Sequence, residues 1–231
     1  MKTIGLIGGM SWESTVPYYQ TINRIVGKRL GGLHSAKIAL YSVEFDEIEK
    51  LQHAGRWEEA GEILADAARA VRRAGADFIV LCTNTMHKVA GQVEAAVDIP
   101  LLHIADATAE RVKAAGVTRV GLLGTKFTME EDFYRGRLEA RHGLTVMTPP
   151  AEQRAAVHRV IYDELCLGIV EGASRRGLQQ IVSDLVEQQA QGVILGCTEI
   201  GLLLRPGDAP VPLFDTAAIH AEAAADYAMS A

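Results

Sequence analysis

Two residues that can take part in proton transfer stand at equivalent positions of a repeated passage. Residues 76–85 read ADFIVLCTNT and residues 190–199 read AQGVILGCTE, and the two align without a gap when Leu81 is set on Leu195. In this alignment Cys197 corresponds to Thr83. Two related halves, each with one polar group at the end of a strand, suit a reaction whose substrate and product are mirror images.

Cys197 is the stronger of the two candidates for a catalytic side chain. It follows the apolar run Val193–Leu195 and Gly196, so we expect it at a strand-to-helix turn. A helix beginning near Thr198 would direct its positive end at the sulfur and lower the thiol pKa below its free value of about 8.5. A lone cysteine is more often a small buried hydrophobe, but the neighbouring Gly, Thr and Glu favour the catalytic interpretation.

Thr83 is in register with Cys197, although Cys82 is its immediate neighbour. Strand side chains alternate in direction, so only one of Cys82 and Thr83 can face a ligand. The alignment predicts that Thr83 does so and that Cys82 packs in the core. Thr83 could instead be only a helix cap for the turn that follows.

Further polar residues follow the two candidates in each copy of the repeat. Asn84, Thr85, Thr198 and Glu199 offer donors at expected helix starts, which is a natural seat for a carboxylate. Capping would explain each of them singly, whereas the paired arrangement favours binding. His87 lies four residues after Thr83, where it could tune the site or be an ordinary helix residue in a polar environment.

The sequence contains no motif for a cofactor or a metal ion. Gly5–Gly9 does not match G-x-G-x-x-G, and it lacks the Lys and Ser/Thr of a phosphate loop. Cys82 and His87 form no recognised zinc spacing with any second pair. We therefore expect neither a metal nor an organic cofactor.

Composition excludes several classes of protein. Among 231 residues, 48% are hydrophobic and 23% are charged, as in a globular protein with a substantial core. The net charge is −6 and the 23 basic residues are scattered, which argues against nucleic acid as a partner. No run approaches a membrane span and the amino terminus shows no signal-peptide pattern. Three widely spaced cysteines favour a reduced cytoplasmic protein over a disulfide framework.

Apolar runs alternate with helical periodicity along the chain, which predicts an α/β fold with parallel sheets covered on both faces. The expected strands are Thr3–Ile7, Ala36–Val43, Phe78–Leu81, Leu101–His103, Val120–Leu123, Leu144–Val146, Val193–Leu195 and Val211–Phe214. The expected helices are Pro17–Leu30, Trp57–Ala74, Ala105–Ala115, Met129–Arg141, Gln153–Leu167, Leu178–Gln189 and Thr216–Met229. Pro17 is expected in the first turn of its helix, after Ser14 and Thr15 as caps.

Four polar turns fall at the carboxyl ends of expected strands, where parallel sheets bind ligands. They are Gly8-Gly9, Thr83–Thr85, Gly124-Thr125 and Cys197–Glu199. A second sequence echo, Thr3–Gly9 against Arg119–Thr125, supports two homologous halves. We predict a first α/β domain of residues 1–97 plus 209–231 and a second of residues 98–208, packed around one cleft.

Three segments together make the whole chain resemble the aspartate/glutamate racemase family of cofactor-independent amino-acid racemases. They are Gly8–Ser14 (GGMSWES), Thr83–His87 (TNTMH) and Leu195–Ile200 (LGCTEI). The resemblance implies two similar domains, each a parallel sheet flanked by helices, related by pseudo-two-fold symmetry with the active site in the cleft between them. It also implies a homodimer.

In this family one cysteine thiolate removes the α-proton of an amino acid, and a second thiol delivers a proton to the opposite face. Where the family reads Cys-Asn-Thr, this chain has Thr83–Thr85. A hydroxyl is a poor base, so Thr83 would donate or relay a proton to a carbanion that Cys197 has formed. The family often has a basic residue near the side-chain carboxylate of the substrate. In this chain the corresponding stretch, after Phe45, contains Gln52. The substrate-binding residues that follow are Met10, Gln52, Thr83, Asn84, Thr85, Thr125, Thr198 and Glu199.

The leading hypothesis is therefore an amino-acid racemase that acts on aspartate or glutamate through Cys197 and Thr83. A hydantoin racemase or a decarboxylase of the same fold remains an alternative, since one thiol is sufficient for a decarboxylase. A binding module without turnover is the alternative from another class. A thiol hydrolase is disfavoured because no His–Asp pair has the expected placement relative to Cys197.

Overall fold

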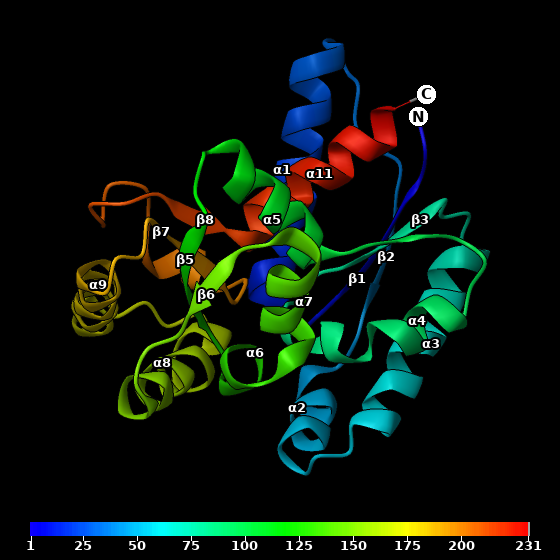
Figure 1. The fold of residues 1–231 in the computed structure, drawn as a ribbon. Helices are drawn as coiled ribbons and strands as arrows, with labels where there is room; N and C mark the ends of the chain where they lie inside the picture. Colours follow the sequence, from blue (N-terminus) through cyan, green and yellow to red (C-terminus); the bar gives the residue numbers. More distant parts are fainter. Residues whose placement is uncertain (231) are drawn as a thin grey trace. The chain divides into compact units, whose positions relative to one another are not determined.

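The computed structural model describes residues 1–230, which divide into two compact units (Figure 1). The amino-terminal unit comprises Met1–Ile104 and the chain from His220 onward, and the carboxyl-terminal unit is Ala105–Ile219. In the described part of the chain, each unit contains one four-stranded parallel sheet flanked by helices. The α/β class predicted from the alternating pattern is confirmed.

The sheet of the amino-terminal unit has the strand order β2-β1-β3-β4. Its strands are β1 (Ile4–Gly8), β2 (Ile38–Ser42), β3 (Phe78–Leu81) and β4 (Leu101–Leu102). Its helices are α1 (Trp12–Leu30), α2 (Phe45–His53), α3 (Trp57–Arg73), the 3₁₀ helix η1 (Thr85–Val89) and α4 (Ala90–Ala95), and α11 (Thr216–Met229) ends in it. β1 and β3 are fully buried, as expected of central strands covered on both faces.

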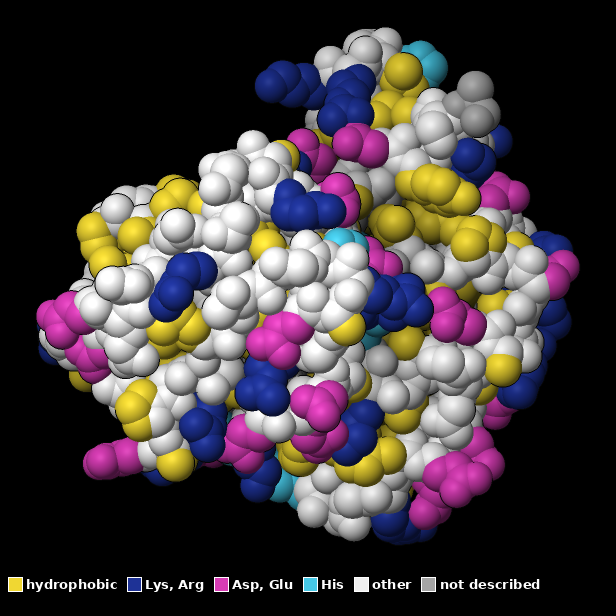
Figure 2. Space-filling model, viewed as in Figure 1, with side chains coloured by type: hydrophobic (Ala, Val, Ile, Leu, Met, Phe, Trp, Pro, Cys, Tyr) yellow, Lys and Arg dark blue, Asp and Glu magenta, His cyan; other side chains and the backbone are white. Residues whose placement is uncertain are grey.

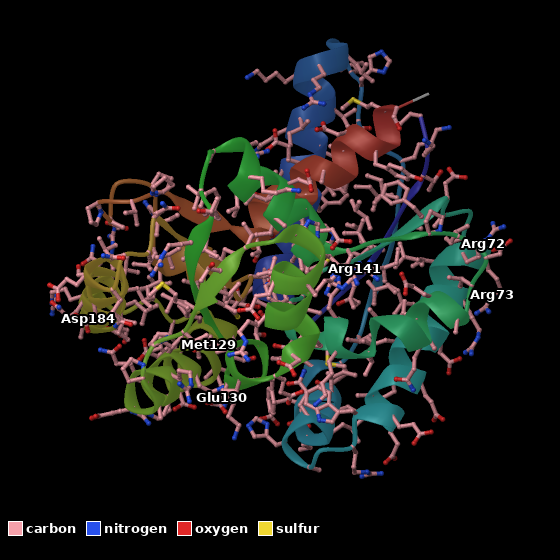
Figure 3. The ribbon with its side chains drawn as sticks, viewed as in Figure 1. Arg72, Arg73, Met129, Glu130, Arg141 and Asp184 are labelled. Atoms are coloured by element: carbon pink, nitrogen blue, oxygen red, sulfur yellow. The ribbon has the colours of Figure 1, made fainter. Side chains whose placement is uncertain are left out.

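The sheet of the carboxyl-terminal unit has the equivalent order β6-β5-β7-β8. Its strands are β5 (Arg119–Gly124), β6 (Thr145–Met147), β7 (Gly192–Gly196) and β8 (Leu213–Asp215). Its helices are α5 (Ile104–Ala114), α6 (Lys126–Glu130), α7 (Asp132–His142), α8 (Ala151–Asp163), the 3₁₀ helix η2 (Leu165–Leu167), α9 (Gly172–Glu187) and α10 (Ile200–Leu203). Met129 and Glu130 lie next to each other on α6 (Figure 3). Met129 is buried, while the exposed Glu130 accepts from Arg154 Nε at 2.8 Å and so connects α6 to α8.

The two sheets share a register as well as a strand order. β1 pairs with β3 through Leu6 and Val80, and β5 pairs with β7 through Leu122 and Ile194. The two sequence echoes place Leu122 on Leu6 and Ile194 on Val80, so the same pairing occurs in both units. The repeated passages therefore encode the same scaffold twice. Within each unit, the two central strands are paired, so the turns that follow them lie side by side.

Helix α1 differs from its predicted form. It begins at Trp12, after Ser11, and Pro17 lies inside it rather than in its first turn. The Ser14 and Thr15 hydroxyls donate to the Ser11 carbonyl at 3.2 and 2.9 Å, so they belong to the first turn and are not caps. The apolar periodicity after Pro17 concealed this earlier start.

Other boundaries also differ. The region predicted as helix Met129–Arg141 is two helices that break at Glu131, and the one predicted over Gln153–Leu167 ends at Asp163 before η2. The sequence reasoning missed α2 and α4. It also assigned residues 209–231 to the first domain, which is wrong for β8 because Leu213–Asp215 pairs with β7.

The surface and the helices bear on possible partners. Basic and acidic side chains are interspersed on the face shown in Figure 2, without a continuous basic surface there. Among residues 1–230, no helix has both the length and the apolar character needed to cross a membrane.

Candidate active-site residues

In the amino-terminal unit, Thr83 lies in the turn after β3, and both its main-chain amide and its main-chain carbonyl are hydrogen-bonded. Its amide donates to the Leu81 carbonyl at 2.8 Å, and its own carbonyl lies 2.7 Å from His87 Nδ1. The residue is 5% exposed, and its hydroxyl makes no hydrogen bond with any other residue between 1 and 230. The cap of η1 is Asn84, not Thr83, so capping does not account for Thr83.

Cys82, beside Thr83, is completely buried. Its thiol is directed at the Val80 carbonyl at 3.7 Å, and burial raises the pKa of that thiol far above its usual range. The prediction that Cys82 packs in the core is confirmed. The Val80 carbonyl beside it cannot take its proton, so this thiol stays protonated.

Two predicted binding residues of the same unit pack against the segment that follows Thr83. Gln52 of α2 donates from Nε2 to Met86 Sδ at 3.0 Å. Met10 belongs to the same buried core cluster as Met86 and Ile48. The fold thus brings the turn after β1, helix α2 and the turn after β3 together, although these segments are far apart in the sequence.

In the carboxyl-terminal unit, Cys197 lies directly after β7 and is 7% exposed. Its Sγ donates to Glu199 Oε2 at 2.9 Å, and the Thr198 hydroxyl donates to the same oxygen at 2.8 Å. Glu199 is itself 1% exposed. The three consecutive residues therefore form a buried group in which the carboxylate accepts a hydrogen bond from the thiol.

The expected lowering of the Cys197 pKa is wrong. Burial, and then the neighbouring Glu199 carboxylate, raise the pKa of the Cys197 thiol well above its usual value. The helix predicted to begin near Thr198 is only the four-residue α10, which begins at Ile200 and provides little dipole. On the amino-terminal side, the helix start expected at Asn84 and Thr85 is the short 3₁₀ helix η1.

Thr125 lies beside the Cys197 turn because β5 and β7 are paired to their ends at Gly124 and Gly196. A Cβ at Gly124 would come within 2.7 Å of the Gly196 carbonyl oxygen, so only glycine permits this approach. Thr125 caps α6 by accepting from the Thr128 amide at 3.3 Å. Thr125 therefore acts as the helix cap of α6.

Cys166 is a neighbour of Cys197 that the sequence reasoning did not single out. It lies in η2, which packs against α10, and its thiol contributes to the raised pKa of Cys197. Its long separation from Cys197 in the sequence left no signal to find it. The three cysteines are free, and within residues 1–230 no three His, Cys, Asp or Glu side chains are grouped as metal ligands would be.

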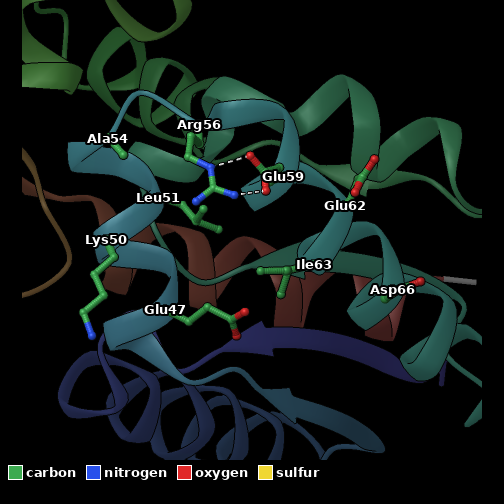
Figure 4. A pocket seen from close by; sticks show the side chains of 9 residues that line it. All are labelled: Glu47, Lys50, Leu51, Ala54, Arg56, Glu59, Glu62, Ile63 and Asp66. Carbon is green, nitrogen blue, oxygen red and sulfur yellow. Dashed lines mark hydrogen bonds and ion pairs between the residues drawn. The ribbon is translucent and has the colours of Figure 1, made fainter.

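A surface hollow of about 620 Å³ lies elsewhere in the amino-terminal unit, between α2 and α3 (Figure 4). Its lining residues are Glu47, Lys50, Leu51, Ala54, Arg56, Glu59, Glu62, Ile63 and Asp66. Arg56 forms an ion pair with Glu59 inside it. None of the predicted site residues lines this hollow.

Two parallel-sheet units with matching order and register, each with a polar turn after its central strands, define the aspartate racemase fold. A crystal structure of an aspartate racemase homologue from Pyrococcus horikoshii superposes with a TM-score of 0.85 at 37% identity over the full length of both chains. A Yersinia pestis protein classed among the Asp/Glu racemases superposes at 0.92 with 59% identity, again over both full chains.

The chain belongs to the Asp/Glu/hydantoin racemase family, whose family model matches residues 7–224. It is also 24% identical over 227 residues to the broad specificity amino-acid racemase RacX of Bacillus subtilis, covering 95% of each chain. The resemblance predicted from Gly8–Ser14, Thr83–His87 and Leu195–Ile200 is confirmed at the level of the family.

Proposed function

We propose that the protein is a cofactor-independent amino-acid racemase that acts on L-aspartate and L-glutamate. Family membership and the similarity to RacX support an amino acid as substrate. The observation that carries the proposal is the 2.9 Å hydrogen bond from Cys197 Sγ to the buried Glu199 carboxylate. This pair can convert a weakly acidic thiol into a base at the moment when a substrate needs one.

The first step is proton transfer within the Cys197–Glu199 pair. Glu199 takes the thiol proton along the existing hydrogen bond, which leaves a thiolate on Cys197 and a neutral acid on Glu199. The thiolate then removes the α-proton of the L-amino acid and becomes a thiol again. A raised resting pKa suits this role, because a more basic thiolate is a better match for a weakly acidic carbon.

The second step delivers a proton to the opposite face of the carbanion. We assign this step to Thr83, whose hydroxyl makes no hydrogen bond within residues 1–230 and so can be directed at a ligand. The hydroxyl gives its proton to carbon as it receives another from water, so that no free alkoxide forms. The proton on Glu199 returns to solvent when the product leaves, and the cycle is balanced.

Substrate recognition is assigned to the buried polar residues around the two turns. The side chains of Asn84, Thr85, Thr125 and Thr198 would hold the α-carboxylate, and Met10 would add an apolar contact. Gln52 would donate to the side-chain carboxylate with its amide, a weaker anchor than a cation. We therefore expect aspartate and glutamate to be turned over with high KM values.

The proposal is tested by incubating the protein with a panel of amino acids in D₂O and measuring α-deuterium incorporation by NMR. Incorporation together with D-enantiomer supports racemisation. Exchange seen only with hydantoins, or decarboxylation of a malonate, would assign the same thiol to one of those reactions. Binding of aspartate or glutamate without exchange would leave a non-catalytic binding module.

We further propose that the protein is a cytoplasmic homodimer. Trp12, Val16 and Tyr19 are 61%, 44% and 52% exposed, and their spacing puts them along one face of α1. A second copy of the chain would cover this apolar face. Light scattering at micromolar concentration tests the dimer, and Val16→Glu should return it to a monomer. Three free cysteines suit a reducing compartment.

A further inference from the structure

The imidazole of His87 occupies a defined place inside the amino-terminal unit. It is 3% exposed, its Nδ1 lies 2.7 Å from the Thr83 carbonyl, and its Nε2 receives the Ile104 amide at 3.3 Å. A carbonyl can only accept and a main-chain amide can only donate. His87 must therefore be neutral with its proton on Nδ1.

The segment on the far side of His87 is itself held firmly. His220 donates from Nε2 to the Leu102 carbonyl at 2.8 Å and accepts at Nδ1 from the Tyr18 hydroxyl at 3.0 Å. Burial lowers the pKa of His220 to about 4, so it stays neutral at physiological pH. Ile104, which follows Leu102 closely, therefore gives His87 a fixed anchor.

We propose that His87 is a positioning residue that directs the hydroxyl of Thr83, an inference that rests on the proposed racemase function. The Thr83 amide bonds to Leu81, and its carbonyl bonds to His87, so both of its peptide planes are fixed. A β-branched side chain then has few rotamers. Since its hydroxyl has no partner within residues 1–230, the main chain that His87 holds decides where that hydroxyl lies.

This role predicts a selective defect when His87 is replaced. In His87→Ala, deuterium exchange of L-aspartate should stay within about twofold of wild type, because Cys197 and Glu199 perform it. Conversion to the D-enantiomer should fall about tenfold or more, because a misplaced group loses rate steeply. His87→Asn should restore most of the conversion, since an amide nitrogen near the Nδ1 position can still donate to Thr83.

His142→Asn is the matched control. His142 is a mostly buried imidazole of the carboxyl-terminal unit, and its polar partners are Asp106 at 2.9 Å and Glu110 at 3.5 Å, both on α5. Its loss should lower stability and leave the ratio of exchange to conversion unchanged. If His87→Ala does not fold, His87→Phe preserves the ring without its hydrogen bonds and carries the same expectation. Equal loss of both rates, no loss of either, or no rescue by Asn would overturn the proposal.

The tautomer of His87 gives a test that does not depend on turnover. In ¹⁵N-labelled protein, the ring should show a protonated Nδ1 and an unprotonated Nε2. The Thr83 carbonyl ¹³C shift should move in His87→Phe and stay in place in His142→Asn. A ring protonated on Nε2 would overturn the inference even in an active enzyme. If the wild type exchanges no amino acid, the proposed function fails and this measurement alone decides the role of His87.

Discussion

The turns after β3 and β7 are built on matching scaffolds and differ in what they hold. In the amino-terminal unit, His87 holds the carbonyl of Thr83 and leaves the hydroxyl without a partner in residues 1–230. In the carboxyl-terminal unit, Glu199 accepts a hydrogen bond from the side chain of Cys197. The residue aligned with His87 is Gly201, where even a Cβ would come within 2.3 Å of Asp215 Oδ2, so a side chain there would have to displace this carboxylate.

Under the proposed function, this difference suits the two turns of a duplicated scaffold to two different proton transfers. A group that must lose its own proton needs an acceptor beside it, and Glu199 provides one for Cys197. A group that only gives a proton needs a fixed direction, which a hydrogen bond to its main chain supplies for Thr83. Four substitutions test whether the two turns have these different roles, and they are ordered from the largest expected effect to the smallest.

Replacing the thiol should have the largest effect. Cys197→Ser should reduce α-deuterium exchange of L-aspartate by at least about 10³-fold, because a hydroxyl is far less acidic than a thiol and Glu199 cannot deprotonate it. The serine still fits the buried site, so circular dichroism and thermal unfolding should change little. Exchange at a rate close to wild type would show that Cys197 is not the base.

Replacing the proton acceptor should separate two effects of Glu199. Glu199→Gln removes a negative charge that raises the pKa of Cys197, so alkylation of Cys197 by iodoacetamide at pH 8 should become faster. It also removes the group that takes the thiol proton, so exchange should slow by about 10- to 100-fold. Peptide mapping by mass spectrometry distinguishes Cys197 from Cys166. Faster alkylation together with faster exchange would mean that the carboxylate only suppresses the thiol.

Changing the hydroxyl should alter the preference for one enantiomer. Wild-type protein should exchange the α-proton of L-aspartate much faster than that of D-aspartate, because each unit of pKa mismatch costs a base about 1.4 kcal/mol. Thr83→Cys places a thiol on the second face and should raise turnover from the D side about tenfold. The measurement is deuterium incorporation into each pure enantiomer. Equal wild-type rates for both would refute the asymmetric mechanism.

Much of the scaffold could be predicted from the sequence because it depends on local patterns. Buried strands of parallel sheets are short apolar runs, and all eight predicted strands overlap strands found within residues 1–230. The ungapped repeat also indicated that the chain is built from two related halves, and the shared strand order agrees with this. Helix α2 left a signal that was missed, since Glu44 caps it by accepting from the Asp46 and Glu47 amides.

The chemistry of the thiol could not be predicted in the same way. The sequence places Thr198 and Glu199 after Cys197, and this pattern fits a helix start that lowers the thiol pKa as well as it fits a turn that does not. The outcome depends on Glu199 turning back to accept a hydrogen bond from the sulfur, and on the burial of both residues. Both depend on tertiary packing, which also brings Cys166 close.

The smallest effect on activity is expected from Cys82, the thiol that lies beside the amino-terminal turn. Its side chain is completely buried, and burial holds its pKa so high that it remains a thiol at any working pH. Cys82→Ala removes a buried atom and should lower the free energy of unfolding by about 1–2 kcal/mol. Turnover should stay within about twofold of wild type, since Thr83 keeps its bonds to Leu81 and His87. Urea unfolding and deuterium exchange on the same preparation measure both quantities. A loss of exchange as large as that of Cys197→Ser would mean that Cys82, and not Thr83, is the reactive residue of this turn, and the comparison would then be between two thiols.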